Sequence, residues 1–503
     1  MSASYDFPAA PDEVDDDLQV RGTRAERHRT RGPSKASAWL VIGLVTLLAG
    51  GMRLWHLSSP HGYVFDEVYY AKDACYDAGY PYKQCGLASP GEQTITVHPP
   101  LGRWIIAGGE AWFGNRAFGW RIASAIFGTL SVMLLAILAL QLFRSVLWAG
   151  VAGLLLATET LNLVQSRVSM LDIFVTTFVV AGILFLVLDR LWMERRTPAG
   201  TAPVVGDLLG LPPDRLPSPL FRPWRLAAGV ALGASMATKW SGLLALLAAI
   251  VLTCVWEWGR RHRARIVHPV RQAFRYETFG ILLFLVVVPL AVYVASYGRW
   301  WVDNGMDVAG WLRLQKEMLE YSVHLRAPHP YASHAYTWLL LKRPVSYYYD
   351  CTVAGAGTSC LQSAEILGLG NPLIFWGTFI TIPYVTVRGW MRRDWIAGLI
   401  VTVFAISYFP WFFAARTSFL FYMAPITPFM VLALVYAIRD LARVPVGAKG
   451  GSMAPAAFAV VVISVGLCIF FYPIIVGHPI SQAQWQHRIW FNGRGFFKWW
   501  NWV

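Results

Sequence analysis

The chain has 503 residues, of which 56% are hydrophobic and only 14% are charged, and it contains 24 Trp, 21 Tyr and 28 Phe. Soluble domains carry about 25% charged residues, so this composition excludes an ordinary soluble protein and predicts an all-α integral membrane protein. The formal net charge of +14 is explained by basic loops on the cytoplasmic side of a membrane, and no nucleic-acid partner is expected.

Residues 1–36 are polar, with an acidic block followed by a basic block, and we expect a disordered cytoplasmic tail. The apolar stretch that follows is too long for a signal peptide and lacks a small-residue cleavage pattern, so we interpret it as a retained anchor. Residues 101–114 are too short and too rich in Gly for a span and predict an interfacial or re-entrant helix. About eleven transmembrane helices are expected, at residues 38–56, 121–143, 147–163, 171–190, 225–239, 241–258, 277–296, 372–388, 395–413, 418–438 and 455–477.

These spans predict a simple organisation. An N-terminal membrane module over residues 37–296 contains spans one to seven and a first large outer loop at 57–120. A second large outer loop covers 297–371, and spans eight to eleven occupy 372–477. We interpret the aromatic tail at 478–503 as an external belt in the lipid headgroups, with a lid or a docking strip for the secretion channel as the alternative.

Lysine and arginine indicate the orientation. They are densest in loops on the side of the N-terminus, for example at residues 260–275, so that side is predicted to be cytoplasmic and the C-terminus to lie outside a plasma membrane. Two pairs of cysteines fall in the outer loops, where disulfides persist. We therefore predict Cys75–Cys85 and Cys351–Cys360 bridges, the alternative being four unpaired thiols.

The first outer loop contains "VFDEVYYAKDA" at residues 64–74. On a helix the adjacent side chains of Asp66 and Glu67 diverge by about 100°, so different roles are natural, and Asp66 shares a face with Tyr69 or Tyr70. A carboxylate in a partly dry pocket has a raised pKa and can act as a general base. The alternative is that Asp66 caps a helix whose other charges face solvent.

Further polar residues lie near the outer ends of the spans. In "VHPPLGRW" (97–104) two prolines hold His98 rigidly at a helix start, where it relays a proton, donates a hydrogen bond or simply stiffens a turn. Lipid-surface anchoring explains any one of the outer cations, but four of them oppose the usual charge bias and suit a lipid phosphate. These cations are Arg121, Arg167, Lys239 and Arg416, and Asp172 follows Arg167.

Several stretches together resemble the protein O-mannosyltransferases of the glycosyltransferase C superfamily. They are "FDEVYYAKDA" (65–74), "VHPPLGRW" (97–104), "GWR" (119–121), "SRVSMLD" (166–172), "TKWSG" (238–242) and "FLFYMAP" (419–425). The resemblance implies a glycosyltransferase C-type bundle with two large extracytoplasmic loops. The roughly 75 residues at 297–371 are too few for the β-trefoil insertion of eukaryotic members, so the chain looks like the shorter actinobacterial form.

The resemblance also implies substrates and roles. The donor would be polyprenyl-phosphate mannose, and the acceptor a Ser or Thr hydroxyl on an unfolded secretory polypeptide, with the secretion channel as a further candidate partner. Asp66 would be the base and Glu67 would position the site, in an inverting displacement without a covalent intermediate. Arg121, Lys239, Arg167 and Arg416 would bind the donor phosphate, and His98, Tyr69, Tyr70, Asp172, Tyr348 and Tyr422 would shape the substrate site.

No cofactor is expected; a divalent metal between Asp66 and Asp172 is the less favoured alternative. Three other functions stay open on the sequence alone. The first is sugar transfer to a lipid or a cell-wall glycan, the second is a structural partner of another transferase, and the third is a transporter. A transporter would be expected to carry polar groups in mid-span and broken helices in matching halves, which the sequence lacks.

Overall fold

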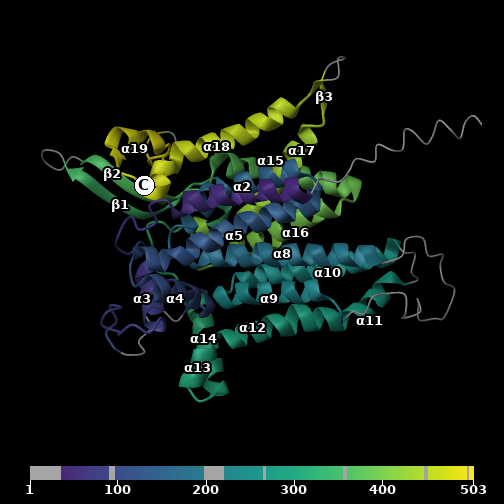
Figure 1. Cartoon of the computed structure of the whole chain (residues 1–503), viewed down its shortest axis with the longest axis horizontal. Helices are drawn as coiled ribbons and strands as arrows, with labels where there is room; N and C mark the ends of the chain where they lie inside the picture. The colour runs from purple at the N-terminus through teal and green to yellow at the C-terminus, as the bar shows by residue number, and fades with distance from the viewer. Residues whose placement is uncertain are drawn as a thin grey trace, which may run out of the picture.

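The computed structural model describes residues 35–89, 97–196, 220–263, 268–354, 360–446, 451–495 and 498–502. Long helices lie side by side and form a bundle, and shorter elements cover one end of it (Figure 1). The helices of the bundle are α2 (Lys35–Leu54), α5 (Ala117–Phe143), α6 (Val146–Ala157), α7 (Thr160–Gln165), α8 (Leu171–Arg196), α9 (Pro223–Thr238), α10 (Gly242–Arg263), α11 (Pro269–Leu282), the π-helix η3 (Leu283–Val287), α12 (Val288–Ser296), α15 (Pro372–Arg392), α16 (Trp395–Tyr408), α17 (Thr427–Leu441) and α18 (Ala454–Val476).

All eleven segments predicted as spans fall on helical structure. Within the described residues, seven helices are long and apolar enough to cross a membrane, counting Pro269–Ser296 as one, so the predicted number of about eleven is not established. The outer surface of α2 is apolar: Leu40 is 63% and Leu47 75% exposed. Apolar surface of this kind on a helix suits contact with lipid tails.

Both predicted outer loops fold at the same end of the bundle, on the left in Figure 1. The first loop contributes α3 (Glu67–Asp77) and α4 (Leu101–Phe113), and the second contributes α13 (Gly298–Asp303), α14 (Val308–His324) and an antiparallel hairpin of β1 (Val345–Ala354) and β2 (Cys360–Gly368). The two cysteine pairs predicted from the sequence are bonded, Cys75 to Cys85 and Cys351 to Cys360. The first bond links α3 to the loop that follows it, and the second links β1 to β2.

The C-terminal tail packs against the second outer loop. Strand β5 (Ile480–Ser481) adds to β2 and precedes α19 (Gln482–Arg488). The Trp502 ring is fully buried and donates its Nε1–H to the carbonyl of Leu341 (2.7 Å), while Trp485 donates to Glu365 Oε2 (2.7 Å). The described part of the tail is therefore bound to the protein, rather than lying only among headgroups as the composition had suggested.

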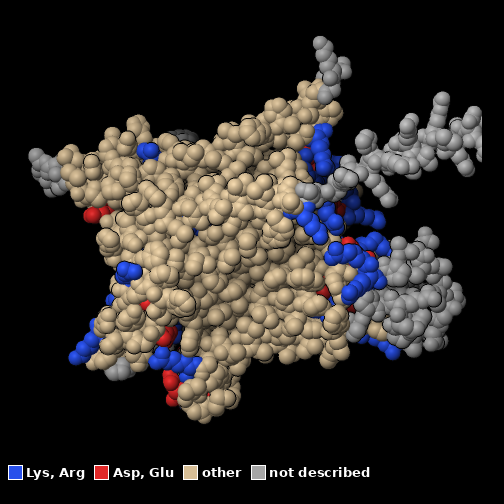
Figure 2. Space-filling model, viewed as in Figure 1, with Lys and Arg blue, Asp and Glu red and all other residues tan. Residues whose placement is uncertain are grey.

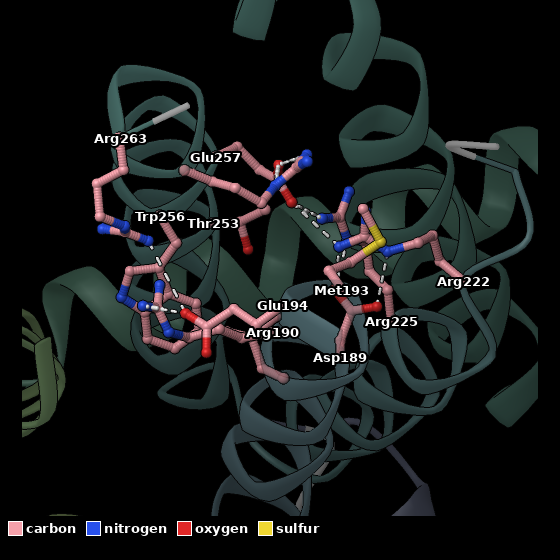
Figure 3. Close-up of a pocket in the computed structure, with 12 residues that line it drawn as sticks. Asp189, Arg190, Met193, Glu194, Arg222, Arg225, Thr253, Trp256, Glu257 and Arg263 are labelled. Atoms are coloured by element: carbon pink, nitrogen blue, oxygen red, sulfur yellow. Dashed lines mark hydrogen bonds and ion pairs between the residues drawn. The ribbon is translucent and has the colours of Figure 1, made fainter. Parts of the chain in front are cut away.

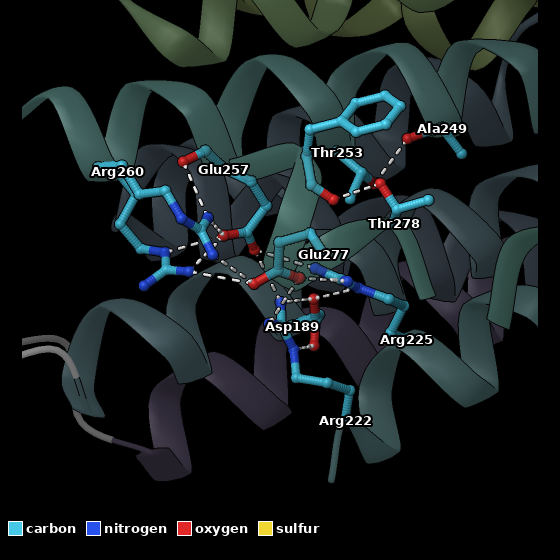
Figure 4. A network of polar contacts seen from close by, with 11 residues as sticks. Asp189, Arg222, Arg225, Ala249, Thr253, Glu257, Arg260, Glu277 and Thr278 are labelled. Atoms are coloured by element: carbon cyan, nitrogen blue, oxygen red, sulfur yellow. Dashed lines mark hydrogen bonds and ion pairs between the residues drawn. The ribbon is translucent and has the colours of Figure 1, made fainter. Parts of the chain in front are cut away.

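Lysine and arginine gather at the opposite end of the molecule (Figure 2). Seven charged side chains from the ends of α8, α9, α10 and α11 and the residue before α9 are buried there in one ion-pair network (Figure 4). They are Asp189, Arg222, Arg225, Glu257, Arg260, Arg261 and Glu277. Beside it lies a small pocket to which Arg190, Glu194 and Arg263 also contribute (Figure 3). Part of the basic charge therefore ties four helices together instead of facing water.

Replacing Glu257 should destabilise the protein, since this carboxylate accepts from Arg225 (3.0 Å), Arg261 (2.9 Å) and two further arginines. Breaking a buried pair costs about 3–5 kcal/mol. We expect Glu257→Ala to lower the thermal unfolding midpoint in detergent well below that of wild type.

The matched control is Glu320→Ala, which removes an exposed i,i+4 pair with Lys316 (3.8 Å). Exposed pairs contribute about 0–1 kcal/mol, so the control should melt close to wild type. If Glu257→Ala unfolded at the same temperature as wild type, the network would not stabilise the helix bundle.

Candidate active site

A buried ion pair anchors the first outer loop. Glu67 lies in the first turn of α3 and Arg121 in the first turn of α5, and both side chains are fully buried. Arg121 Nε and Nη2 each donate to one oxygen of Glu67 at 2.8 Å. This bidentate geometry is the strongest arrangement available to an arginine and a carboxylate.

The remaining hydrogen-bond donors and acceptors of Glu67 and Arg121 are satisfied by other groups of the protein. Glu67 also accepts from the backbone N–H of Val64 (2.8 Å) and of Ser169 (2.9 Å) and from Trp120 Nε1 (3.2 Å). Arg121 gives its other donors to the carbonyls of Leu57, Pro60 and Gly62. An arginine has five N–H donors, so none remains for a phosphate. Glu67 and Arg121 therefore bind each other and the loop backbone, whereas we had expected Arg121 to contact a phosphate.

Arg167 is also engaged by the backbone. Its Nη1 donates to the carbonyls of Met52 (3.1 Å), Arg53 (3.0 Å) and Trp55 (2.7 Å), and its side chain is 5% exposed. The last carbonyls of a helix have no partner inside the helix, and a cation there is favourable. Arg167 thus caps the end of α2, which differs from the expected contact with a lipid phosphate.

Asp66 is presented differently from its neighbour Glu67. It precedes α3, its side chain makes no capping hydrogen bond, and among the described residues its carboxylate has no hydrogen-bond partner. Phe65 before it has φ of 50°, a conformation rare for a bulky residue and common near functional sites. Burial, opposed by Lys239 and assisted by Asp172, raises the pKa of Asp66 to about 6.

Lys239 and Asp172 form the second ion pair of the site. Lys239 ends α9, Asp172 opens α8, and Nζ lies 2.9 Å from both oxygens of the carboxylate. The ammonium also lies 4.6 Å from the centre of the Tyr422 ring. Asp172 engages at most two of the three ammonium donors, so one remains for another acceptor.

Arg416 supplies a cation that is not neutralised locally. Its Nη2 is 3.5 Å from Tyr422 Oη and its Nε is 3.4 Å from the carbonyl of Thr417. It is partly exposed, and no carboxylate in the described part of the chain pairs with it. An unpaired guanidinium next to a lysine is suited to an anion such as a phosphate ester.

His98 and Tyr70 lie on one side of this centre, with their rings 6.1 Å apart. Burial and then the nearby Lys239 and Arg416 hold the pKa of His98 well below its usual value, so the ring is neutral. Burial and then the Asp66 carboxylate raise the pKa of Tyr70. Tyr69, by contrast, is 40% exposed. Of the two tyrosines that the sequence offered, the structure brings Tyr70 to the site.

The hairpin contributes a tyrosine that sequence reasoning missed. Tyr347 is 5% exposed, accepts from Gln165 Nε2 (2.6 Å) and packs 5.0 Å from the Phe65 ring. Burial and then Asp172 and Asp66 raise its pKa. Tyr348, which we had expected to shape the site, is only partly buried, and its hydroxyl donates to Asp350. The register of β1 is irregular between Ser346 and Tyr348, so simple strand alternation would not have separated the two tyrosines.

The arrangement combines a half-buried carboxylate with two cations, Lys239 and Arg416. Within the described residues, no group of three or more His, Cys, Asp or Glu side chains could hold a metal ion. The Asp172 oxygens face the ammonium of Lys239, which also lowers the pKa of Asp66. Such a centre can remove a proton beside a bound anion.

The fold is that of membrane-embedded glycosyltransferases. One chain of the protein O-mannosyltransferase Pmt1-Pmt2 complex of Saccharomyces cerevisiae, bound to the sugar donor, matches with a TM-score of 0.72 at 15% identity. The match covers 96% of this chain and 96% of the yeast chain. ArnT from Cupriavidus metallidurans matches with a TM-score of 0.51 at 16% identity, over 88% of this chain and 78% of ArnT.

Sequence comparison narrows this class to one family. The family described as dolichyl-phosphate-mannose-protein mannosyltransferase matches residues 43–199 and 221–298, and the C-terminal four TMM region of protein-O-mannosyltransferase matches 308–494. The polyprenol-phosphate-mannose–protein mannosyltransferase of Mycobacterium tuberculosis is 30% identical over 91% of this chain and 92% of its own, and that of Corynebacterium glutamicum is 28% identical over 90% and 92%. The chain belongs to this family of multi-pass membrane proteins and is a mannosyltransferase.

The two adjacent tyrosines of β1 provide a matched test of the site. We expect Tyr347→Ala to lower mannosyl transfer at least tenfold, because it removes the ring packed on Phe65 beside Asp66. Tyr348→Ala should stay within twofold of wild type, since its ring is half-buried and bonds only Asp350 among the described residues. Initial rates on purified protein measure both. Equal losses in the two variants would show that the hairpin matters only for folding.

Proposed function

We propose that the protein transfers mannose from polyprenyl-phosphate mannose to Ser and Thr hydroxyls of secreted or membrane polypeptides, at the outer face of the plasma membrane. The observation that carries this proposal is the placement of Asp66: a carboxylate without a hydrogen-bond partner in the described chain, its pKa raised to about 6, near Lys239. The named relatives act from polyprenol-phosphate mannose on proteins, which supports this donor and this class of acceptor.

The reaction is a single displacement that inverts the anomeric carbon. Asp66 takes the proton of the acceptor hydroxyl as its oxygen forms a bond to C1 of mannose. The bond from C1 to the phosphate oxygen breaks, and the phosphate leaves with the electron pair. Arg416 and the free donor of Lys239 bind the phosphate and stabilise its growing charge. No divalent cation is required, because these two side chains supply the positive charge.

The proposed orientation rests on two features at opposite ends of the bundle. Asp66 and both disulfides lie at the end formed by the two large loops, and disulfides persist on the oxidising side of a membrane. Lysine and arginine gather at the other end (Figure 2), which suits the cytoplasmic side. The N-terminus would then be inside and the C-terminus outside.

Replacing the base tests the mechanism. General base catalysis contributes about 10²–10⁴-fold, so Asp66→Asn should lower transfer of labelled mannose to a Ser/Thr-rich peptide at least a hundredfold. Asp350→Asn, an exposed carboxylate on β1, is the control and should retain activity. A chelator should leave the wild-type rate unchanged. Label on a glycolipid and none on the peptide would contradict the proposed acceptor. An Asp66→Asn variant with wild-type activity would contradict the proposed base.

The pH dependence gives a separate test. Asp66 must be ionised to accept a proton, so kcat/KM should fall as the pH drops through about 6, the pKa to which burial raises this group. Burial lowers the pKa of His98 well below its usual value, so we do not expect His98 to cause this fall. A profile that stays level between pH 5 and 7 would contradict the assignment of the base.

A further inference from the structure

A pocket of about 440 Å³ opens beside the site, where α3 and α4 meet α12, α13 and α14. This volume lies within the usual range of ligand sites, about 300–1,000 Å³. The two outer loops, far apart in sequence, form its two sides. The proposed mechanism uses none of this space, although His98, near the reaction centre, is one of the lining residues.

A row of alternating charges joins the two sides of the pocket. Arg103 on α4 lies 3.4 Å from Asp73 and 3.5 Å from Asp77, both on α3. Arg299 on α13 lies 3.5 Å from Asp77 and 3.4 Å from Asp303. Four of these five line the pocket, two acids and two arginines, so their formal charges cancel. The lining therefore offers both donors and acceptors but no net charge.

Aromatic rings make up much of the remaining surface. Trp104, Tyr297 and Trp300 line the pocket, and Trp104 is 38% exposed. Tyr76 also lines it, under the guanidinium of Arg299, 5.2 Å from the ring centre. Broad rings beside mixed polar groups are typical of surfaces that hold a flexible polar chain, since rings give contact area at little entropic cost.

His98 connects the pocket to the reaction centre. Its ring lies 6.1 Å from Tyr70, and the charges of Lys239 and Arg416 act on it directly. A chain lying in the pocket would therefore pass His98 before it reached Asp66.

We propose that this pocket is the subsite for the acceptor polypeptide, holding an extended segment next to the hydroxyl that is mannosylated. The inference rests on the proposed function, and it names where the protein substrate binds. Peptide groups carry one donor and one acceptor per residue and match a lining with both. A polyprenyl tail would leave four charged side chains facing hydrocarbon, which is costly.

Two variants test the subsite on the full-length enzyme. We expect Trp104→Ala and Arg299→Ala each to raise the KM for a Ser/Thr-rich peptide about tenfold or more, with the KM for the donor and the rate at saturating peptide within threefold of wild type. Arg299 is partly exposed at the pocket, so its removal should leave folding intact even if Trp104→Ala does not fold.

The chain offers matched controls for both. Trp112 lies on α4 as Trp104 does but is 84% exposed, and Arg313 on α14 is largely exposed and outside the pocket lining. Trp112→Ala and Arg313→Ala should keep the wild-type peptide KM. An unchanged peptide KM in Arg299→Ala, or a rise in the donor KM instead, would overturn the subsite. Failure of the wild-type enzyme to label any peptide would overturn the proposed function as well, so the two failures are distinguishable.

Discussion

The site depends on one buried ion pair, between Glu67 of α3 and Arg121 of α5. A buried ion pair is stable only when its geometry is good and its remaining hydrogen-bond donors and acceptors also have partners. Here the carboxylate accepts from Arg121, Trp120 and two backbone N–H groups, and the guanidinium reaches three loop carbonyls besides. The pair therefore binds the first outer loop to the bundle at the residue next to Asp66. Because adjacent side chains at a helix start point in different directions, the inward position of Glu67 leaves Asp66 half-buried and under the influence of Lys239 and Asp172.

The outer cations divide into two kinds, although the sequence presents them alike. Arg121 and Arg167 donate to acceptors of the protein itself and link neighbouring segments of the chain. Lys239 and Arg416 keep donors that the protein does not use. The distinction follows from the partners of each side chain, because several backbone carbonyls accept from Arg121 and Arg167, whereas one carboxylate accepts from Lys239 and Arg416 lies partly exposed. In the proposed mechanism, only the second kind touches the donor.

Sequence alone predicts the helical membrane bundle and both cysteine pairs, because these follow from local composition and short spacings. It also predicts different roles for the adjacent acids Asp66 and Glu67. It does not identify Tyr347 over Tyr348, since that choice depends on the register of a strand packed against Phe65. Nor does it assign Arg121, whose partners are scattered from Leu57 to Glu67. The sequence does not reveal the ion-pair network around Glu257 at the basic end of the bundle either, because positive charges in loops normally face water.

The central claim is that a proton acceptor and two phosphate-binding cations converge in one crevice. A structure of the protein with polyprenyl phosphate bound tests it most directly. The account predicts phosphate oxygens within hydrogen-bonding distance of Arg416 and Lys239, with Asp66 across the space left for the sugar and Arg121 still paired with Glu67. Phosphate bound elsewhere, or bound by Arg121 after separation from Glu67, would contradict it.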